Sequence, residues 1–425
     1  MQVTIAYHAL VFRPCRAWII MTALTALSPW QGCLGSGASD SSALKTYALP
    51  GKIFSADISP DERLVAIEGS PQDKPGRADV SRPSSVIELW DFRADRLVSR
   101  ATLSESTLPQ PSGGSVAFAL QEAPFVRFTG DGKLLATYRH DTIEVFRTDD
   151  FSQFRSITVT PPPSSTRTYN LKRYGDQKMT YRPEVQGFEM SPTGTLLAIL
   201  WVSGVTNGRV DVYDVSSGQQ VATWETPRSR WVPPEAGRDL AWSPDSRMIF
   251  VASTNSIPCL APSVRPDVFG FDARTGTLKT SFTTGLMVGD IAVSPARELL
   301  AVDANCVGLI SNHHPKMAVI DLNMGDHLRD VGAKGGGVRY RVAISRNGER
   351  VVAWTSHVKC GTFDWLDMNC YGASVKPTFT VWHLPDFEIV AKSQILSAEG
   401  FLRISSSGRY VLVYGAGTGL IYEVP

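Results

Sequence analysis

Short hydrophobic runs separated by tight turns recur seven times along the chain. In each unit a strand ends in Ser or Thr, a turn containing Pro, Asp, Asn, Ser or Gly follows, and the next strand is almost entirely hydrophobic. Pro presets φ at the first corner of such a turn, and Asp, Asn and Gly tolerate its later positions. Each unit therefore contains a β-hairpin. The seven turns begin at Ser59, Thr129, Ser191, Ser243, Ser294, Ser345 and Ser405.

The strands of one unit differ in their hydrophobic pattern. The strand after each turn is hydrophobic at successive positions, as in Leu64 to Ile67, which is typical of a strand buried on both faces. A third strand alternates, as in Val86 to Trp90, and a weaker fourth strand follows, as in Gln220 to Trp224. Four strands at this period make one propeller blade. We predict an all-β, seven-bladed β-propeller of four-stranded blades, with six or eight blades as alternatives.

Residues 43–425 resemble bacterial β-propellers of the WD-repeat and TolB-like kinds. Four pairs stand where WD-repeat proteins end the third strand with Trp-Asp: Trp90-Asp91, Tyr213-Asp214, Phe271-Asp272 and Ile320-Asp321. The Gly-His signature of WD repeats is missing, and the Ser-Pro-Asp turns are more similar to those of TolB-type propellers. The resemblance implies a ring of blades. It leaves function open, because related folds include lactonases and other hydrolases.

The seventh unit supplies only three strands, namely Phe401 to Ser405, Arg409 to Gly415 and Leu420 to Val424. The segment Leu44 to Leu49 can provide the fourth. Pairing it with the C-terminal strand would remove the open edge of the last blade and close the ring. We therefore expect an N-terminal strand to complete the last blade.

The N-terminal region has the features of an export signal. Arg13 and Arg16 precede the hydrophobic run Ala17 to Leu27, which is shorter than the roughly 20 residues that a membrane-spanning helix needs. Gly32-Cys33 and the small, polar residues 34–42 resemble a bacterial lipoprotein, which implies a signal peptide over 1–33, lipidation of Cys33 and a flexible linker. Cleavage after Gly37 or Ala38, or a buried N-terminal helix, are the alternatives. We expect an exported protein at the periplasm or cell surface, anchored to the lipid bilayer.

Cysteine usage agrees with export. If Cys15 is removed with the leader and Cys33 is lipidated or removed, four cysteines remain, and an even number in an exported chain predicts two disulfides. The repeat register favours pairing of Cys360 with Cys370 and of Cys259 with Cys306. A zinc site formed by all four is the alternative, although no two of them have the usual close spacing of zinc ligands.

The charge balance restricts the partner. With 42 Lys and Arg against 41 Asp and Glu, the net charge of +1 gives no bulk basic field for nucleic acid. The composition, 43% hydrophobic and 20% charged, is that of an ordinary globular protein. Any specific recognition must therefore come from local surface segments.

The long connections of the repeat all fall on one face of the predicted ring. They join the second strand to the third and the fourth to the next unit, whereas the other turns are short. Loops on a rigid scaffold commonly carry binding, and Tyr and Arg are common interface anchors. The candidate binding residues are Tyr169, Arg173, Tyr174 and Tyr181 in the segment Pro161 to Pro183, Trp231 in the segment 227–238, and Phe363 and Trp365 between Cys360 and Cys370. An acidic protein patch or a glycan suits the first segment, and merely solvated loops are the alternative.

The chain contains little that points to catalysis. It has neither a Gly-x-Ser-x-Gly nor a His-Glu-x-x-His motif. His313, His314 and His357 could share a metal, but adjacent histidines rarely chelate one ion, and Asp364, Asp367 and Asn369 do not have the spacing of an EF-hand calcium loop. Gly415 to Gly419 is interpreted as a hairpin rather than a phosphate loop. We expect no cofactor, metal or catalytic residue, and a platform that binds another envelope or extracellular protein. The alternative is a hydrolase or lactonase-like enzyme with a site at the central channel.

Overall fold

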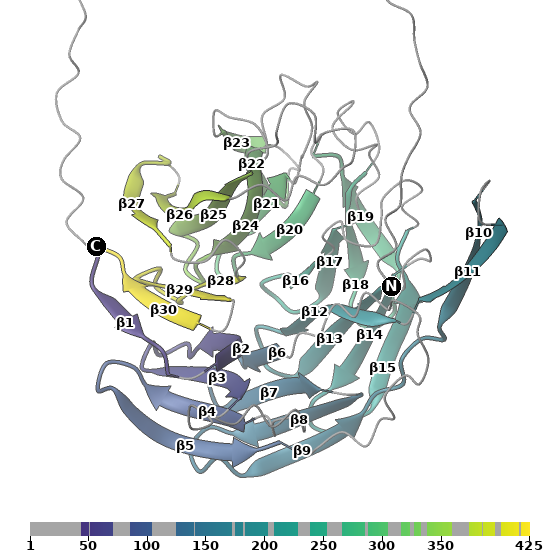
Figure 1. Cartoon of the computed structure of the whole chain (residues 1–425), viewed down its shortest axis with the longest axis horizontal. Coiled ribbons are helices and arrows are strands. Elements are labelled where there is room, and N and C mark those ends of the chain that lie inside the picture. Colours follow the sequence, from purple (N-terminus) through teal and green to yellow (C-terminus); the bar gives the residue numbers. More distant parts are fainter. Residues whose placement is uncertain are drawn as a thin grey trace, which may run out of the picture.

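Seven four-stranded antiparallel sheets follow one another around a central axis in the computed structural model of the chain (Figure 1). In six of them the strands follow chain order from the axis to the rim, and the N-terminal strand completes the seventh. This confirms the seven-bladed β-propeller. The structure describes residues 44–50, 52–70, 86–103, 125–139, 141–171, 175–181, 183–202, 208–227, 239–252, 266–284, 288–304, 316–323, 327–332, 338–358, 374–384, 386–395, 401–415 and 418–425.

The blades are numbered in chain order, each with its inner strand first. Blade 1 contains β2 (Lys52–Ile58), β3 (Leu64–Ser70), β4 (Val86–Asp91) and β5 (Arg96–Thr102). Blade 2 contains β6 (Phe125–Phe128), β7 (Leu134–Arg139), β8 (Thr142–Arg147) and β9 (Gln153–Thr158). Blade 3 contains β12 (Glu184–Met190), β13 (Leu196–Val202), β14 (Arg209–Asp214) and β15 (Gln220–Glu225). Blade 4 contains β16 (Leu240–Trp242), β17 (Met248–Ala252), β18 (Val268–Asp272) and β19 (Leu278–Phe282).

The remaining blades follow the same plan. Blade 5 contains β20 (Val288–Val293), β21 (Leu299–Ala304), β22 (Lys316–Asp321) and β23 (His327–Gly332). Blade 6 contains β24 (Val338–Ile344), β25 (Arg350–Val358), β26 (Ser374–His383) and β27 (Ile389–Gln394). Blade 7 contains β28 (Phe401–Ile404), β29 (Tyr410–Gly415), β30 (Thr418–Glu423) and, on its outer edge, β1 (Thr46–Ala48).

The N-terminal strand closes the ring as the sequence predicts. β1 pairs antiparallel with β30 through Thr46↔Tyr422, Tyr47↔Ile421 and Ala48↔Leu420. Backbone bonds flank the pairing, from Leu49 N to Gly419 O at 2.9 Å and from Glu423 N to Lys45 O at 2.8 Å. The pairing of β29 with β30 also makes the Gly415 to Gly419 segment a hairpin, as predicted.

The repeated Ser or Thr fixes the turn after each inner strand. The Ser191 hydroxyl accepts a hydrogen bond from the Leu196 N–H at 3.0 Å, and Thr129, Ser243 and the other anchors outside blade 5 do the same five residues along the chain. The fourth position of the turn has positive φ, which Gly adopts without strain, as at Gly132 and Gly194. Blade 5 departs from this pattern, because Ser294 accepts from Arg297 N at 3.3 Å.

Hydrophobic side chains pack between blades rather than within one central core. The buried hydrophobic residues form seven clusters, one at each interface between neighbouring blades. β13 is buried along its whole length, which confirms that second strands are covered on both faces. The outer strands are more exposed, as in β5 and β19. Within the described part of the chain, we find no helix long and apolar enough to cross a membrane.

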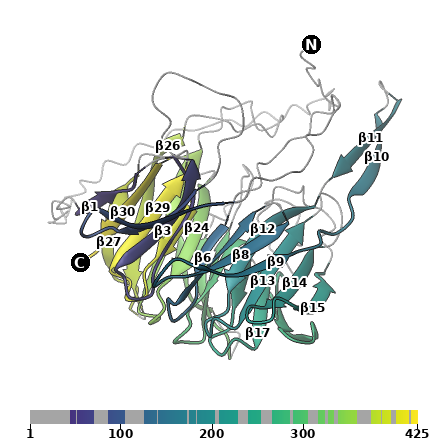
Figure 2. The same ribbon diagram turned by 90° about the horizontal axis from the view of Figure 1, so that it is seen from below.

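One element is added to the propeller plan. The segment between β9 and β12, which the sequence analysis treats as a loop, forms an antiparallel hairpin of β10 (Ser165–Leu171) and β11 (Gly175–Tyr181). The strands are rich in Thr and Tyr, which favour β structure. They form a sheet of their own, which extends past the edge of the ring (Figure 2).

Candidate functional site

The two faces of the ring differ as predicted. Turns from the first to the second strand and from the third to the fourth are short, whereas 15 residues separate β3 from β4 and 22 separate β5 from β6. Because successive strands run in opposite directions, all the long connections leave the same face of the ring. The hairpin β10–β11 belongs to this face, since it joins the outer strand of blade 2 to the inner strand of blade 3.

Most of the predicted site residues lie outside the described residues. This applies to Cys33, Arg173, Tyr174, Trp231, Cys259, Cys306, Cys360, Phe363, Trp365 and Cys370, and also to His313, His314, Asp364, Asp367 and Asn369. Lipidation and both disulfide pairings therefore stay predictions. Tyr169 lies in β10, Tyr181 in β11 and His357 in β25.

The register of the hairpin sorts its residues into two unlike faces. Directly paired residues of antiparallel strands share a face, and alternate residues along a strand do too. One face is therefore assigned the aromatic, hydrophobic and basic positions Arg167, Tyr169, Leu171, Met179 and Tyr181, together with Ser165, Gly175 and Gln177. The opposite face is assigned Thr166, Thr168, Asn170, Asp176, Lys178 and Thr180. Tyr169 and Tyr181 thus share a face that the sequence alone did not reveal.

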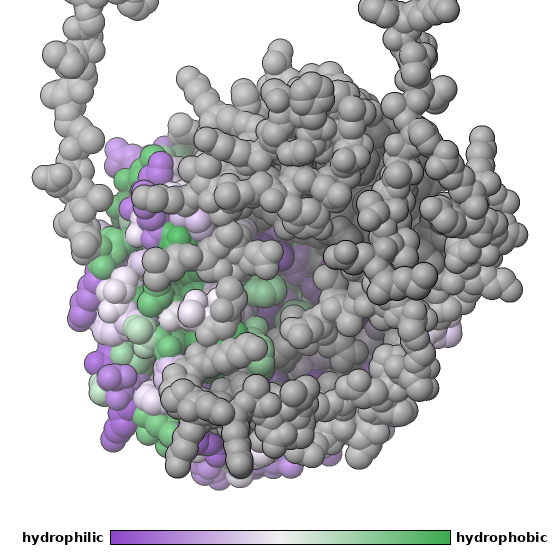
Figure 3. All heavy atoms as spheres, in the orientation of Figure 1, coloured by the Kyte–Doolittle hydropathy of each residue, from purple (hydrophilic) through white to green (hydrophobic). Residues whose placement is uncertain are grey.

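A second feature, which the sequence analysis missed, lies around the axis. Each blade has a charged residue at one of two matched positions in its inner strand or directly before it: Asp57, Arg127, Glu189, Asp239, Asp290, Arg341 and Arg403. Three of the inner strands contain a further charged residue, Lys52, Glu184 or Arg339. We call the seven residues at the matched positions the axial ring. In the space-filling view, hydrophilic residues are visible near the centre of the molecule (Figure 3).

The axial ring follows the repeat register. In blades 1, 2, 3 and 7 the charged residue stands two positions before the Ser or Thr anchor of the turn. In blades 4, 5 and 6 that position is Ala, at Ala241, Ala292 and Ala343, and the charged residue stands four positions before the anchor. The charged residues therefore occupy two levels of the inner strands, one in blades 1, 2, 3 and 7 and the other in blades 4, 5 and 6. An alignment of the seven units on their anchors would have revealed this pattern.

Two arginines converge on one carboxylate of the axial ring. Arg127 Nε donates to Glu189 Oε1 at 2.8 Å, and Arg403 Nη2 donates to the same oxygen at 3.0 Å. Blades 3 and 7 are not neighbours, so the Arg403–Glu189 pair spans the axis. Arg127 is only 5% exposed, which makes this a largely desolvated ion pair.

Two aspartates of the axial ring bind the next blade. Asp57 Oδ2 accepts from Phe128 N at 2.9 Å, and Asp290 Oδ2 accepts from Val342 N at 2.9 Å. The inner strand of a blade is a sheet edge with unpaired backbone groups, and a buried N–H without a partner is costly. These carboxylates therefore stabilise the contacts between neighbouring inner strands.

Burial raises the pKa of three carboxyl groups of the axial ring, those of Asp57, Glu189 and Asp239. Burial raises the pKa of Asp57 to about 6 and that of Glu189 to about 7, although Arg127 opposes both shifts. The pKa of Asp239 is raised well above its ordinary value, first by burial and then by the charge of Asp290 and the hydrogen bond with it. Within the described ranges, no group of three or more His, Cys, Asp or Glu side chains is arranged to hold a metal ion.

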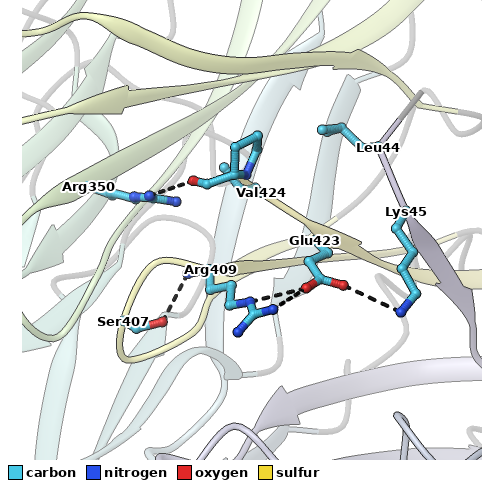
Figure 4. Close-up of a pocket in the computed structure, with 8 residues that line it drawn as sticks. Leu44, Lys45, Arg350, Ser407, Arg409, Glu423 and Val424 are labelled. Carbon is cyan, nitrogen blue, oxygen red and sulfur yellow. Dashed lines mark hydrogen bonds and ion pairs between the residues drawn. The ribbon is translucent and has the colours of Figure 1, made fainter. Parts of the chain in front are cut away.

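A cavity of about 520 Å³ lies beside the closing strand, but its charges are already paired (Figure 4). Glu423 accepts from Arg409 Nε at 3.1 Å and from the Tyr47 hydroxyl at 3.1 Å, and Lys45 Nζ lies 3.7 Å from it. The Arg409 hydrogen bond lowers the pKa of Glu423. The arrangement holds the N-terminal strand against β30, and such exposed pairs contribute little energy each.

Comparison with known proteins finds no sequence family and a distant structural similarity. No protein-family profile matches the chain, and no curated protein matches its sequence. Among solved structures the chain is similar to Kuenenia stuttgartiensis hydrazine synthase, with 13% identity and a TM-score of 0.46 over 68% of this chain and 72% of that chain. No conclusion about function follows from a similarity of this size.

Proposed function

We propose that the protein is an exported, membrane-anchored β-propeller that binds another envelope or extracellular protein, without catalysis, through its loop-rich face. The hairpin β10–β11 carries this proposal. It stands apart from the seven blades and places Tyr169 and Tyr181 on one face together with Arg167. An isolated two-stranded hairpin is marginally stable in water, so an additional element that serves binding is expected to gain order from a partner.

The composition of the hairpin face indicates the chemistry of the partner. Tyr and Arg provide large contact areas and hydrogen bonds to carboxylates. Met179 and Leu171 add hydrophobic positions to the same face. An acidic protein surface with exposed hydrophobic groups therefore fits best. The net charge of +1 supports a protein partner over nucleic acid.

The axial ring supports a binding protein rather than the competing hydrolase or lactonase-like enzyme. Arg127 and Arg403 are bonded to Glu189, and Asp57 and Asp290 are bonded to backbone N–H groups of neighbouring blades. Groups engaged in this way hold the ring together. An enzyme would need charged groups that are available to a substrate.

The proposal also covers the cellular location of the protein and the subfamily of propellers to which it is related. The basic and hydrophobic leader and Gly32-Cys33 support a lipid anchor at Cys33, and the Ser-Pro-Asp turns support kinship with TolB-like and WD-repeat propellers. The linker 34–42 would let the ring move relative to the membrane surface.

Crosslinking in native membranes tests the binding function. The wild-type chain is compared with a variant in which residues 165–181 are replaced by a short Gly-Ser linker, and with the double variant Tyr169→Ser/Tyr181→Ser. We expect both to lose a discrete crosslinked partner while their melting temperatures stay at the wild-type value, because the hairpin pairs with no described strand of the ring.

A matched control changes the opposite face of the hairpin through Thr168→Ser/Thr180→Ser. This variant should keep the partner. If the linker variant recovers the same partner in the same amount as the wild type, the hairpin is not the binding element and the proposal fails.

A further inference from the structure

The hydrophobic interface between blades 1 and 2 ends in a polar pair. Leu64 and Ala66 of β3 and Leu135 of β7 belong to the cluster between these blades. Glu68 and Thr137 follow at the next positions on the same faces of the two strands, because alternate residues of a strand share a face. The Thr137 hydroxyl donates to Glu68 Oε2 at 2.7 Å, and both residues are fully buried. A carboxyl group therefore lies at an interface that is otherwise formed by hydrophobic side chains.

The second oxygen of this carboxyl is unpaired. Glu68 Oε1 is buried and has no hydrogen-bond partner in the part of the chain that the structure describes. Asp211 in blade 3 shows what a buried carboxylate requires, because its oxygens accept from four side chains. Glu68 has a single hydroxyl donor among the described residues. Its surroundings therefore lack the donors that would solvate a negative charge.

A guanidinium group at the same interface does not bond to the unpaired oxygen. Arg139 stands two positions after Thr137 in β7 and shares its face. Arg139 Nη1 is also buried without a hydrogen-bond partner, so this atom and Glu68 Oε1 are not bonded to each other. The charge of Arg139 favours ionisation of Glu68, whereas the charge of Glu144, which pairs with Thr137 from β8, opposes it. The two neighbouring charges thus act in opposite directions.

The polar groups of the adjacent inner strand are engaged elsewhere. Ser55 of β2 is paired with Glu68, but its hydroxyl accepts from Val126 N at 3.1 Å. Asp57 of the same strand accepts from Phe128 N at 2.9 Å. Both groups bind the backbone of blade 2 and supply no donor to Glu68.

We propose that Glu68 is held as the neutral acid at neutral pH, and that the interface between blades 1 and 2 loses stability as the pH rises, because a carboxylate is not accommodated there. A neutral carboxyl needs little beyond its bond with Thr137, whereas a buried charge without compensating donors is costly. Glu68 lies two residues before the end of β3, so the weakened part of the interface is the end nearest the loop-rich face. This property is independent of what that face binds.

The direction of the pH effect follows from linkage. Burial raises the pKa of Glu68 from 4.5 to about 8, against the opposing effects of the Thr137 hydrogen bond and the Arg139 charge. Between these two values the folded state holds one more proton than the unfolded state. The free energy of unfolding therefore falls as pH rises from 4.5 to about 8, and it is constant with respect to this group at higher pH.

Urea unfolding at pH 5.5, 7.0 and 8.0 tests the proposal with wild type, Glu68→Gln and the control Glu298→Gln. The amide of Glu68→Gln is neutral at every pH, so this variant should gain stability relative to wild type as the pH rises. We expect the ratio of its unfolding constant to that of wild type to fall by at least about tenfold between pH 5.5 and 8.0, which corresponds to one unit of pKa. Glu298 is an exposed turn residue, and its substitution should leave the wild-type profile unchanged.

Infrared difference spectra between wild type and Glu68→Gln at pH 7 test the protonation state directly. The wild type should show the carbonyl stretch of a protonated carboxyl that the variant lacks. Parallel urea profiles for the two proteins, or the absence of this band from the difference spectrum, would overturn the proposal. Asp57 and Glu189, whose pKa values burial also raises, are present in all three proteins and cancel in the comparison.

If Glu68→Gln does not fold, hydrogen exchange on the wild type decides. After correction for intrinsic rates, the protection of β3 and β7 should fall between pH 5.5 and 8.0 more than that of β17 and β21, which belong to blades 4 and 5. A uniform change in all four strands would refute a local effect at the interface between blades 1 and 2.

Discussion

One buried carboxylate inside blade 3 accepts hydrogen bonds from several neighbouring side chains. Asp211 in β14 is fully buried, and its carboxylate accepts from Trp201 Nε1 at 2.8 Å, Arg209 Nη2 at 2.6 Å, Gln220 Nε2 at 3.1 Å and Thr223 Oγ1 at 2.7 Å. The alternating pattern of the third strand thus marks buried, paired positions as well as exposed ones. A buried carboxylate with several donors stabilises its surroundings only while every donor has its acceptor.

Two substitutions in this hydrogen-bond network should lower the free energy of unfolding by different amounts. Asp211→Asn keeps the shape but leaves Arg209 without its charge partner, so we expect a loss of about 3 kcal/mol in the free energy of unfolding. Thr223→Val removes one donor from the same carboxylate and should cost about 1 kcal/mol. Urea unfolding at pH 7 measures both, and equal losses would show that the network does not depend on the charge.

The charged residues of the axial ring could not be predicted from their local sequence. Asp57, Glu189 and Asp290 stand in strands whose hydrophobic pattern is otherwise regular, and no local motif distinguishes them. These residues form the axial ring only because the inner strands of all seven blades, which are far apart in the sequence, lie around one axis. Arg403 and Glu189 are 214 residues apart and belong to blades that are not neighbours.

At the scale of strands, the pattern of hydrophobic residues predicted most of the fold. The inner-strand turns, the buried second strands and the closing N-terminal strand agree with the structure. Their prediction succeeds because Ser, Pro, Asp and Gly act locally, within five residues of one another. The hairpin β10–β11 differs from the predicted loop because it adds two strands between repeat units, and neither strand contains the continuous hydrophobic run that marks a blade strand.

The closing strand gives a prediction at this scale. A chain that begins at residue 51 should melt well below one that begins at residue 43, because β30 would lose its partner and leave an open edge. Each kcal/mol lost lowers the melting temperature by about 2–4 °C in a domain of 150–250 residues, and somewhat less in a larger one. Calorimetry on both chains measures the difference. Removal of residues 34–42 alone serves as the control, and equal melting temperatures for all three would contradict closure by β1.

At the scale of the whole molecule, stability is distributed over seven equivalent interfaces. Each hydrophobic cluster joins two neighbouring blades, and the ring has no terminal blade because blade 7 contacts blade 1 through residues such as Tyr410 and Ile53. Each blade therefore depends on both neighbours, and we expect the ring to unfold as one cooperative unit.

A cavity at one interface should test this cooperativity. Phe188 is fully buried between blades 2 and 3, with its ring centroid 5.9 Å from that of Phe125 and 6.1 Å from that of Tyr138. Phe188→Ala should cost about 3–5 kcal/mol and shift a single transition. Leu278→Ala, at a position that is 50% exposed, should cost less than about 0.5 kcal/mol. A second transition in the Phe188→Ala melt would show that blades unfold separately.

The pairing of β1 with β30 also sets the order of events during synthesis. Tyr47 is bonded to Glu423, 376 residues further along the chain, so β1 cannot pair until β30 has been made. Blades 1 to 6 can form in turn as the chain emerges, because their strands are close in sequence. Blade 7 and the two interfaces beside it cannot be completed until β30 has been made. During that interval both ends of the growing ring expose hydrophobic surface, and this is when a chaperone or a second nascent chain would encounter the protein in its most aggregation-prone form.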